Sequence, residues 1–194
     1  FGVVALHGDL EQKDRDQTLV RFANKSASIL VATDVAARGL DIEALDAVFN
    51  YNLAHDTEVH IHRIGRTGRA GSTGYAFTLF SNKDRYKIGL LEDYLERTIE
   101  GEELPSNEVL EHSVFTAKMA TIQIDGGKKQ KVRPGDIVGA LTSENGITFE
   151  QVGKIQLGPN WAYVAVEKMV ARKALNKLTH GKLKGRTFRV RELK

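Results

Sequence analysis

The first hundred residues alternate between short apolar runs and longer stretches in which apolar positions recur at helical spacing. The apolar runs predict strands, and the helical spacing predicts helices between them. The strands are expected at residues 3–7, 29–32, 47–53 and 75–81, and the helices at 11–24, 57–64 and 82–98. This order is typical of an α/β fold, a parallel sheet covered by helices on both faces.

The apolar positions of two of these helices define the faces that we expect to be buried. They are Leu19, Phe22 and Ala23 in the first helix, and Ile88, Leu91 and Leu95 in the last. The acidic stretch that follows has no regular period. We therefore predict one domain over residues 1–98, a linker over 99–118 and a second domain over 119–194.

The second domain has a different order of elements, β-α-β-β-α-β. Strands are expected at 120–125, 154–157, 161–167 and 186–192, and helices at 134–144 and 168–178. This is the order of the ferredoxin-like, RRM-like α+β fold.

Alternation along the third of these strands separates a core face from an open face. The small and branched side chains belong in the core, so Trp161 and Tyr163 are expected on the open face, where aromatic side chains of an RRM stack on RNA bases. Gln123 stands where such a fold usually has another aromatic residue. An alternative for Trp161 is packing under the linker or against the neighbouring domain.

Charge divides the 194 residues into two unlike halves. Residues 1–104 carry 12 Lys and Arg against 17 Asp and Glu, whereas residues 105–194 carry 16 against 8, a net of +8. The basic half is the one whose field attracts a polyanion. Cysteine is absent, which is compatible with the cytosol. No apolar run approaches the roughly 18 residues that a membrane span needs, so we expect a cytoplasmic protein.

Two stretches of the first domain carry candidate chemistry. HRIGRTGRAG (residues 62–71) spaces three arginines by three residues, and the guanidinium fork matches phosphate oxygens. The alternative is a solvated basic turn at a helix C-terminus. In TDVAARGLDI (33–42), Asp41 is a candidate for the hydroxyls of a ribose and Thr33 for a backbone phosphate. The alternative here is a helix that starts with Asp34 as its cap.

HGDLEQKDRDQTLVRF, ATDVAARGLDI and HRIGRTGRAG, in this order, resemble the second RecA-like domain of a DEAD-box RNA helicase over about residues 1–98. The resemblance implies that Arg66 and Arg69 are arginine fingers and that Gly39 and Asp41 bind ATP. It further implies interdomain coupling by Arg38, His62 and Arg63, and contacts to RNA by Gly8, Gln12, Arg15 and Thr33.

The sequence contains neither the phosphate loop GxxxxGK[ST] nor a DEAD motif. The resemblance therefore implies that ATP and Mg²⁺ are held mainly by the first RecA-like domain, which we expect upstream together with one more strand and helix. The chain begins at Phe1, and we interpret it as a fragment. The six histidines show no spacing typical of a metal site.

The second domain resembles the RNA-binding domain that bacterial DEAD-box helicases of the DbpA group attach to their core. The resemblance is carried by IDGGKKQKVRPGDIVGAL, AYVAV and GKLKGRTFRVREL. Two basic clusters stand out in it, and contacts from such side chains to phosphates supply affinity for RNA. The candidate RNA-binding residues are Lys128, Lys129, Lys131, Arg133, Trp161, Tyr163, Lys182, Lys184, Arg186, Arg189 and Arg191.

We therefore expect an ATP-dependent RNA helicase, monomeric, that is targeted to structured 23S rRNA during assembly of the large ribosomal subunit. The fragment by itself is expected to bind RNA without hydrolysing ATP, and the basic loops to contribute more affinity than the sheet. The alternatives are a cold-shock helicase of the DeaD/CsdA group and a non-enzymatic RNA-binding or annealing protein.

Overall fold

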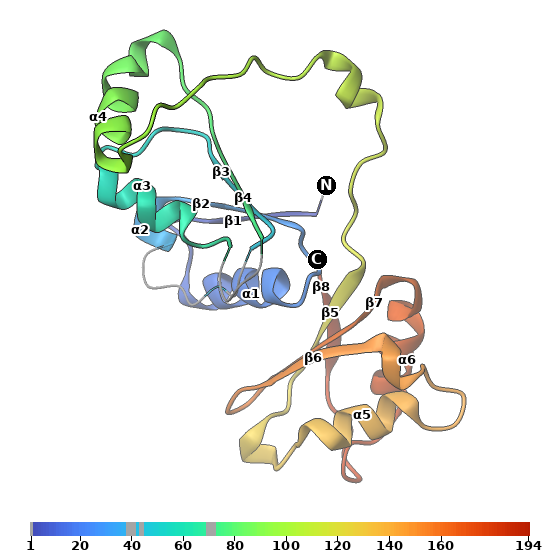
Figure 1. Cartoon of the computed structure of the whole chain (residues 1–194). Helices are drawn as coiled ribbons and strands as arrows, with labels where there is room; N and C mark the ends of the chain where they lie inside the picture. The colour runs from blue at the N-terminus through green and yellow to red at the C-terminus, as the bar shows by residue number, and fades with distance from the viewer. Residues whose placement is uncertain (1, 38–41, 43–44, 69–72) are drawn as a thin grey trace. The chain divides into compact units, whose positions relative to one another are not determined.

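The computed structural model describes residues 2–37, 42, 45–68 and 73–194 (Figure 1). Its contacts divide the chain into two compact units, the first made of residues 1–39 and 113–194 and the second of residues 40–112. Among the described residues, no helix combines the length and the apolar character needed to cross a bilayer.

The first unit begins with two parallel strands and two helices. They are β1 (Val3–Leu6), α1 (Gln12–Ala23), β2 (Ile29–Ala32) and α2 (Asp34–Ala37). The parallel ladder pairs Val3 with Ile29 and Leu6 with Ala32, as the apolar runs predicted. The carboxyl ends of both strands therefore meet at one edge.

The second unit contains another parallel pair. Its elements are β3 (Ala47–Asn50), α3 (Thr57–Ile64), β4 (Tyr75–Thr78), a 3₁₀ turn (Asn82–Asp84), α4 (Arg85–Leu95) and a second 3₁₀ turn (Asn107–Glu111). The predicted inward residues Ile88 and Leu91 are buried and form a cluster with Leu53. Leu95, which we also predicted to face inward, is half-buried.

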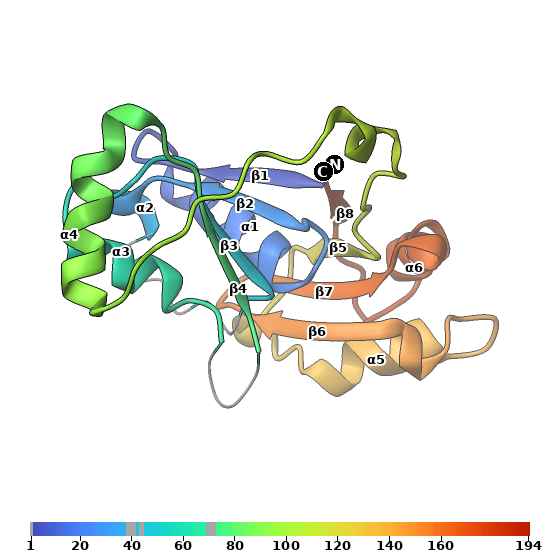
Figure 2. The same ribbon diagram turned by 45° about the horizontal axis from the view of Figure 1, so that its top comes forward.

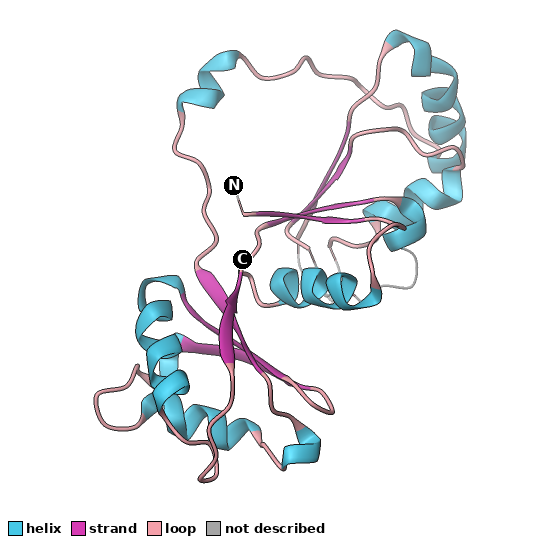
Figure 3. Cartoon of the chain, turned by 180° about the vertical axis from the view of Figure 1, so that it is seen from behind, coloured by secondary structure: helices cyan, strands magenta, loops and turns pink. Residues whose placement is uncertain are grey.

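The C-terminal part of the first unit follows the predicted β-α-β-β-α-β order. Its strands are β5 (Met119–Ile124), β6 (Val152–Leu157), β7 (Ala162–Glu167) and β8 (Val190–Leu193), and its helices are α5 (Pro134–Thr142) and α6 (Ala171–His180). All neighbouring strands are antiparallel, in the order β6-β7-β5-β8. Both helices lie on the same side of this sheet (Figures 2 and 3).

The core of this domain lies between the sheet and the two helices. Ala162, Val164 and Val166 are fully buried there, as the alternation along β7 predicted. Phe188 and Val190 pack against the same core from the last part of the chain. Each buried branched side chain contributes about 1.5–3 kcal/mol relative to an exposed one.

The opposite face of the sheet is not open. Tyr163 is only 4% exposed and packs in one cluster with Val20 of α1 and with Leu193, and Trp161 lies against this cluster. The prediction of an open face is therefore wrong at Tyr163, and for Trp161 the alternative of packing against a neighbouring element is observed. The physical reason is that α1 presents Val20 to this face.

Polar contacts accompany this packing of α1 on β5. The Asn24 amide donates to the Thr121 hydroxyl over 3.2 Å, and the hydroxyls of Ser26 and Thr121 are 2.7 Å apart. Asn24 is 2% exposed, whereas Ala23 is exposed. The prediction that Ala23 belongs to the buried face of α1 is therefore wrong, because a buried amide with a partner replaces it.

Candidate functional site

The carboxyl edge of the β1–β2 ladder carries three of the predicted RNA-contacting residues. Gly8 follows β1, Gln12 begins α1 and Thr33 follows β2, and all three are exposed. A Cβ atom on Gly8 would meet no atom within 4 Å, so the backbone there is open to a ligand. The structure places these three residues where parallel sheets bind their ligands.

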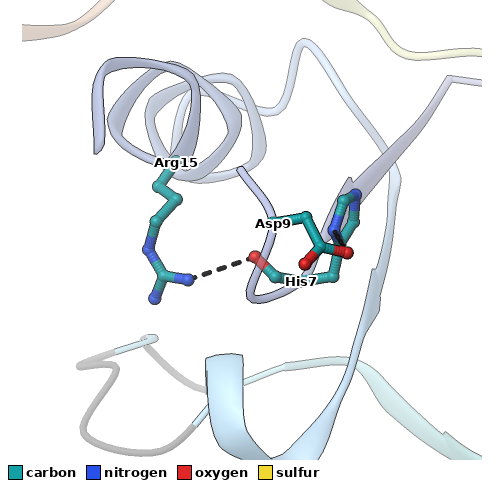
Figure 4. A network of polar contacts seen from close by, with 3 residues as sticks. All are labelled: His7, Asp9 and Arg15. Atoms are coloured by element: carbon teal, nitrogen blue, oxygen red, sulfur yellow. Dashed lines mark hydrogen bonds and ion pairs between the residues drawn. The ribbon is translucent and has the colours of Figure 1, made fainter. Parts of the chain in front are cut away.

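Arg15 holds this edge together. Its guanidinium donates to the His7 carbonyl over 3.3 Å (Figure 4). It also donates to the Ala36 carbonyl over 3.5 Å, so it connects the end of β1 with α2. The His7 ring lies 3.6 Å from the Asp9 carboxylate in the same turn. We predicted Arg15 as an RNA contact. In the structure it is half-buried, and two of its five donors position the backbone.

In the second unit, α3 leads into the arginine-rich stretch. The helix begins with Asp56 as its cap, whose carboxylate accepts from the Glu58 amide over 2.7 Å. Arg63, in the last turn, donates to the Asn50 side chain over 3.3 Å and to the Asn52 carbonyl over 2.7 Å. Arg63 therefore connects α3 to the end of β3. His62 is exposed on the same helix.

Hydrogen bonds of the backbone fix the position of Arg66. Its carbonyl accepts from the Leu45 amide over 3.0 Å, and the next hydroxyl, that of Thr67, donates to the Leu45 carbonyl. Gly68 then has a φ of +63°, a left-handed conformation that glycine adopts without strain. The half-buried Arg66 side chain thus starts from a fixed position. The predicted residues Arg38, Gly39, Asp41 and Arg69 lie outside the described residues.

His60 is a buried histidine that we had not assigned to any role. It is 7% exposed in α3, and its Nδ1 atom has no hydrogen-bond partner among the described residues. Burial, together with the positive charge of Arg63, lowers the pKa of its imidazole below the ordinary value. His60 therefore contributes to folding as a neutral side chain.

The two predicted basic clusters of the C-terminal domain meet at one carboxylate. Asp136, in the first turn of α5, accepts from the Arg133 amide over 2.8 Å, and its Oδ2 atom lies 3.6 Å from the Lys184 ammonium. Lys184 and Gly185 both have positive φ, and Leu183 and Arg186 exchange two backbone hydrogen bonds around them. This two-residue hairpin presents Lys184 to the helix start.

Backbone hydrogen bonds hold the first of these clusters, residues 128–133, in place. The amides of Lys128 and Lys129 donate to the carbonyls of Gly158 and Pro159, each over 2.9 Å. We use the term joined basic surface for the exposed cations that this arrangement gathers. They are Lys128, Lys129, Lys131, Arg133, Lys184 and Arg186.

The two arginines at the end of the chain differ in their contacts. Arg191 in β8 donates to the side-chain oxygen of Gln123 over 2.9 Å, and the side-chain amide of Gln17 donates to the same oxygen over 3.3 Å. Arg191 is exposed but engaged at the contact between the sheet and α1, and Arg189, which precedes β8, is exposed as well. Burial also raises the pKa of the Tyr163 hydroxyl in this contact.

Sequence reasoning did not identify Asp136 or the polar face of α1. Asp136 follows RPG at a predicted helix start, so its capping role had a local signal. Its contact to Lys184, 48 positions away, had none. Gln17, Asn24 and Ser26 form a polar stripe along α1 and the turn after it, which a search for apolar faces overlooks.

Comparison with known proteins finds two family models that match separate parts of the chain. Residues 1–71 match the model of the helicase conserved C-terminal domain, and residues 121–192 match that of the DbpA RNA binding domain. ATP-dependent RNA helicase DbpA of Escherichia coli is 52% identical over 191 residues, which are 98% of this chain and 41% of the relative.

Two further relatives extend this comparison. ATP-dependent RNA helicase DbpA of Bacillus subtilis is 31% identical over 205 residues, covering 95% of this chain and 43% of the relative. ATP-dependent RNA helicase DeaD of Mycobacterium tuberculosis is 28% identical over 261 residues, covering 95% and 46%. The chain thus spans less than half the length of the relatives it matches. With both matched domains in this order, the chain belongs to the DEAD-box RNA helicase family, in its DbpA group.

Proposed function

We propose that this chain supplies the RNA-anchoring domain and the arginine-finger half of an ATP-dependent RNA helicase. The observation that carries the proposal is the joined basic surface. The contacts of Asp136 to the Arg133 amide and to Lys184 bring two loops with six exposed cations to one place in a domain of net positive charge. Such a surface neutralises RNA phosphates.

The preferred RNA is a structured one, a segment of 23S rRNA. Closed RNA helices offer phosphates, shape and 2′-hydroxyls, and few free bases for stacking. This suits a domain whose basic loops are exposed while Tyr163 is buried under α1. The likeness to two ATP-dependent RNA helicases supports RNA as the ligand.

For the nucleotide, the proposal assigns Arg66 and Arg69 to the charge that develops on the transferring phosphoryl group of ATP. A guanidinium fits phosphate oxygens, and Arg66 starts from a backbone held by Leu45. Mg²⁺ bound with ATP would neutralise phosphate charge. Gly8, Gln12 and Thr33 lie exposed at one strand edge, which suits contacts from the core to an RNA backbone.

A competition titration tests this function. The purified chain is expected to bind a structured 23S rRNA fragment more tightly than duplex DNA of equal length, and to show no RNA-stimulated ATP hydrolysis. Equal affinity for the two nucleic acids would contradict the targeting. ATP hydrolysis by the pure chain would contradict the proposal that the ATP site needs both RecA-like domains.

The likeness to DeaD of Mycobacterium tuberculosis keeps a second helicase group in view. Crosslinking of the chain to total ribosomal RNA separates the two possibilities. Crosslinks confined to one structured element of 23S rRNA would support the proposed target. Crosslinks scattered over many RNAs would favour a general cold-shock role.

A further inference from the structure

A groove of about 480 Å³ opens on the helical side of the C-terminal domain, away from the sheet face that α1 covers. It lies between the end of α5, the exposed side of α6 and the two residues that follow α6. Its ionisable lining side chains are all basic, namely Lys173, Lys177, His180 and Lys182, and the amides of Asn145 and Asn176 add further hydrogen-bonding groups. An occupant of this groove is therefore expected to be anionic.

Two of the basic side chains also stabilise the ends of the helices. The Lys177 ammonium donates to the Glu144 carbonyl over 2.5 Å, and the His180 ring lies 3.0 Å from the Asn176 carbonyl. A cation at a helix C-terminus offsets its partial negative charge, so Lys177 has a structural role as well. Lys173 and Lys182 are exposed and are the better probes of binding.

The groove continues into the joined basic surface. Lys182 lines the groove at the C-terminal end of α5, and Lys184, two residues later, contacts Asp136 at the N-terminal end of the same helix. Two residues of chain span at most about 7 Å, so the groove and the joined basic surface adjoin one another. Each strand of a duplex carries a charge about every 3.4 Å along its axis, so this distance corresponds to about two phosphates.

We propose that the groove is a second phosphate-backbone site, which takes the phosphodiester backbone of an RNA whose other end is held by the joined basic surface. The proposal rests on the RNA-binding function proposed above. Continuity with the joined basic surface favours a polymer over a small anion, because one extended chain of phosphates occupies both places at once.

The test compares two double substitutions in the complete 194-residue chain. Lys173→Gln with Lys182→Gln removes two exposed groove cations and leaves the contact of Lys177 to Glu144 in place. Lys118→Gln with Lys168→Gln is the matched control, since both lysines are exposed in the same unit and neither lines the groove. The probes are a structured 23S rRNA hairpin and the same hairpin with a single-stranded extension.

The groove variant is expected to lose affinity for the extended hairpin, and its salt slope to fall by about 0.7–0.9 for each lost contact. Its affinity for the short hairpin is expected to fall less, because only the extension occupies the groove, and both affinities of the control stay unchanged. Equal binding of the extended hairpin by groove variant and control would overturn the proposal. So would displacement of the extension by inorganic tripolyphosphate at equal phosphate concentration, which would mark a small-anion site.

The same titration separates this proposal from the one on which it rests. If the unsubstituted chain binds neither hairpin, the RNA-binding function itself fails, and the groove proposal fails with it. If the unsubstituted chain binds both hairpins equally and the groove variant does too, only the groove proposal fails.

Discussion

His60 makes the stability of the second unit depend on pH. The imidazole is buried, its Nδ1 atom lacks a hydrogen-bond partner in the part of the chain that the structure describes, and burial lowers its pKa below the ordinary 6.5. Below pH 6.5 the unfolded chain takes up a proton that the folded chain does not, so stability falls as the pH drops from 6.5 to the lowered value. Below that value the loss stops growing, because both states are protonated.

Thermal unfolding followed between pH 8 and pH 5 measures this effect. His60→Phe keeps an apolar ring in the same place and is expected to flatten the loss of stability on acidification. His55→Gln, at an exposed histidine of the same unit, is expected to leave it intact. Identical pH profiles for the unsubstituted chain and His60→Phe would contradict the assignment.

At the scale of single residues, sequence reasoning predicted burial correctly where alternation along one strand decides it. Alternation along β7 placed Ala162, Val164 and Val166 in the core, and all three are buried. Sequence reasoning failed for Ala23 and Asn24. Burial of the Asn24 amide depends on its hydrogen bond to Thr121, which lies about a hundred positions away in the chain. No local pattern encodes that partner.

At the scale of elements, the contact between α1 and the sheet has a direct chemical test. The hydroxyl oxygens of Ser26 and Thr121 are 2.7 Å apart, and the chain contains no cysteine. Ser26→Cys with Thr121→Cys is therefore expected to form a disulfide on mild oxidation, since a sulfur–sulfur bond of about 2.05 Å is within reach of that separation.

Mass spectrometry of the oxidised protein reads out this bond. Ser26→Cys with Ser143→Cys is the control, because Ser143 lies at the end of α5, on the helical side of the domain, and is expected to leave both thiols free within one chain. Failure of the first pair to oxidise within the chain, under conditions that oxidise exposed thiols between chains, would contradict the packing of α1 on β5.

Tryptophan fluorescence reports on the same contact between α1 and the sheet. Trp161 is the single tryptophan of the chain and lies against the cluster of Val20, Tyr163 and Leu193. Val20→Asp places a charge in this cluster and is expected to separate α1 from the sheet, which shifts the tryptophan emission to longer wavelength. Ala23→Asp adds the same charge at an exposed position of the same helix and serves as the control. Unchanged emission in Val20→Asp would place Trp161 outside the contact.

Elements were predictable from the sequence to a large extent, and their assembly was not. The β-α-β-β-α-β order and both helices of the C-terminal domain follow from apolar period and from Pro134 at a helix start. The joining of two basic loops depends on the hairpin at Lys184 reaching Asp136, and the covering of the sheet depends on α1. Both are tertiary contacts between segments far apart in the chain.

At the scale of the whole molecule, the proposed function gives the two halves of the chain different steps. In the longer protein with both RecA-like domains, Arg66→Ala is expected to lower the rate of RNA-stimulated ATP hydrolysis by about 10³–10⁵-fold, as for other arginine fingers. RNA affinity of the C-terminal domain is expected to stay unchanged. Single-turnover kinetics at saturating ATP measure the first quantity, and a loss below tenfold would contradict the role of Arg66.

The central claim is that the joined basic surface holds structured RNA. The most direct measurement is the salt dependence of binding of a 23S rRNA hairpin by the chain, compared with the variant Lys128→Gln, Lys129→Gln, Arg133→Gln and with Trp161→Ala. The triple variant is expected to bind more weakly and to lose about 0.7–0.9 from the slope of log K against log salt for each lost contact, whereas Trp161→Ala keeps the full slope. A triple variant with unchanged affinity and slope, or a larger loss in Trp161→Ala, would contradict the claim.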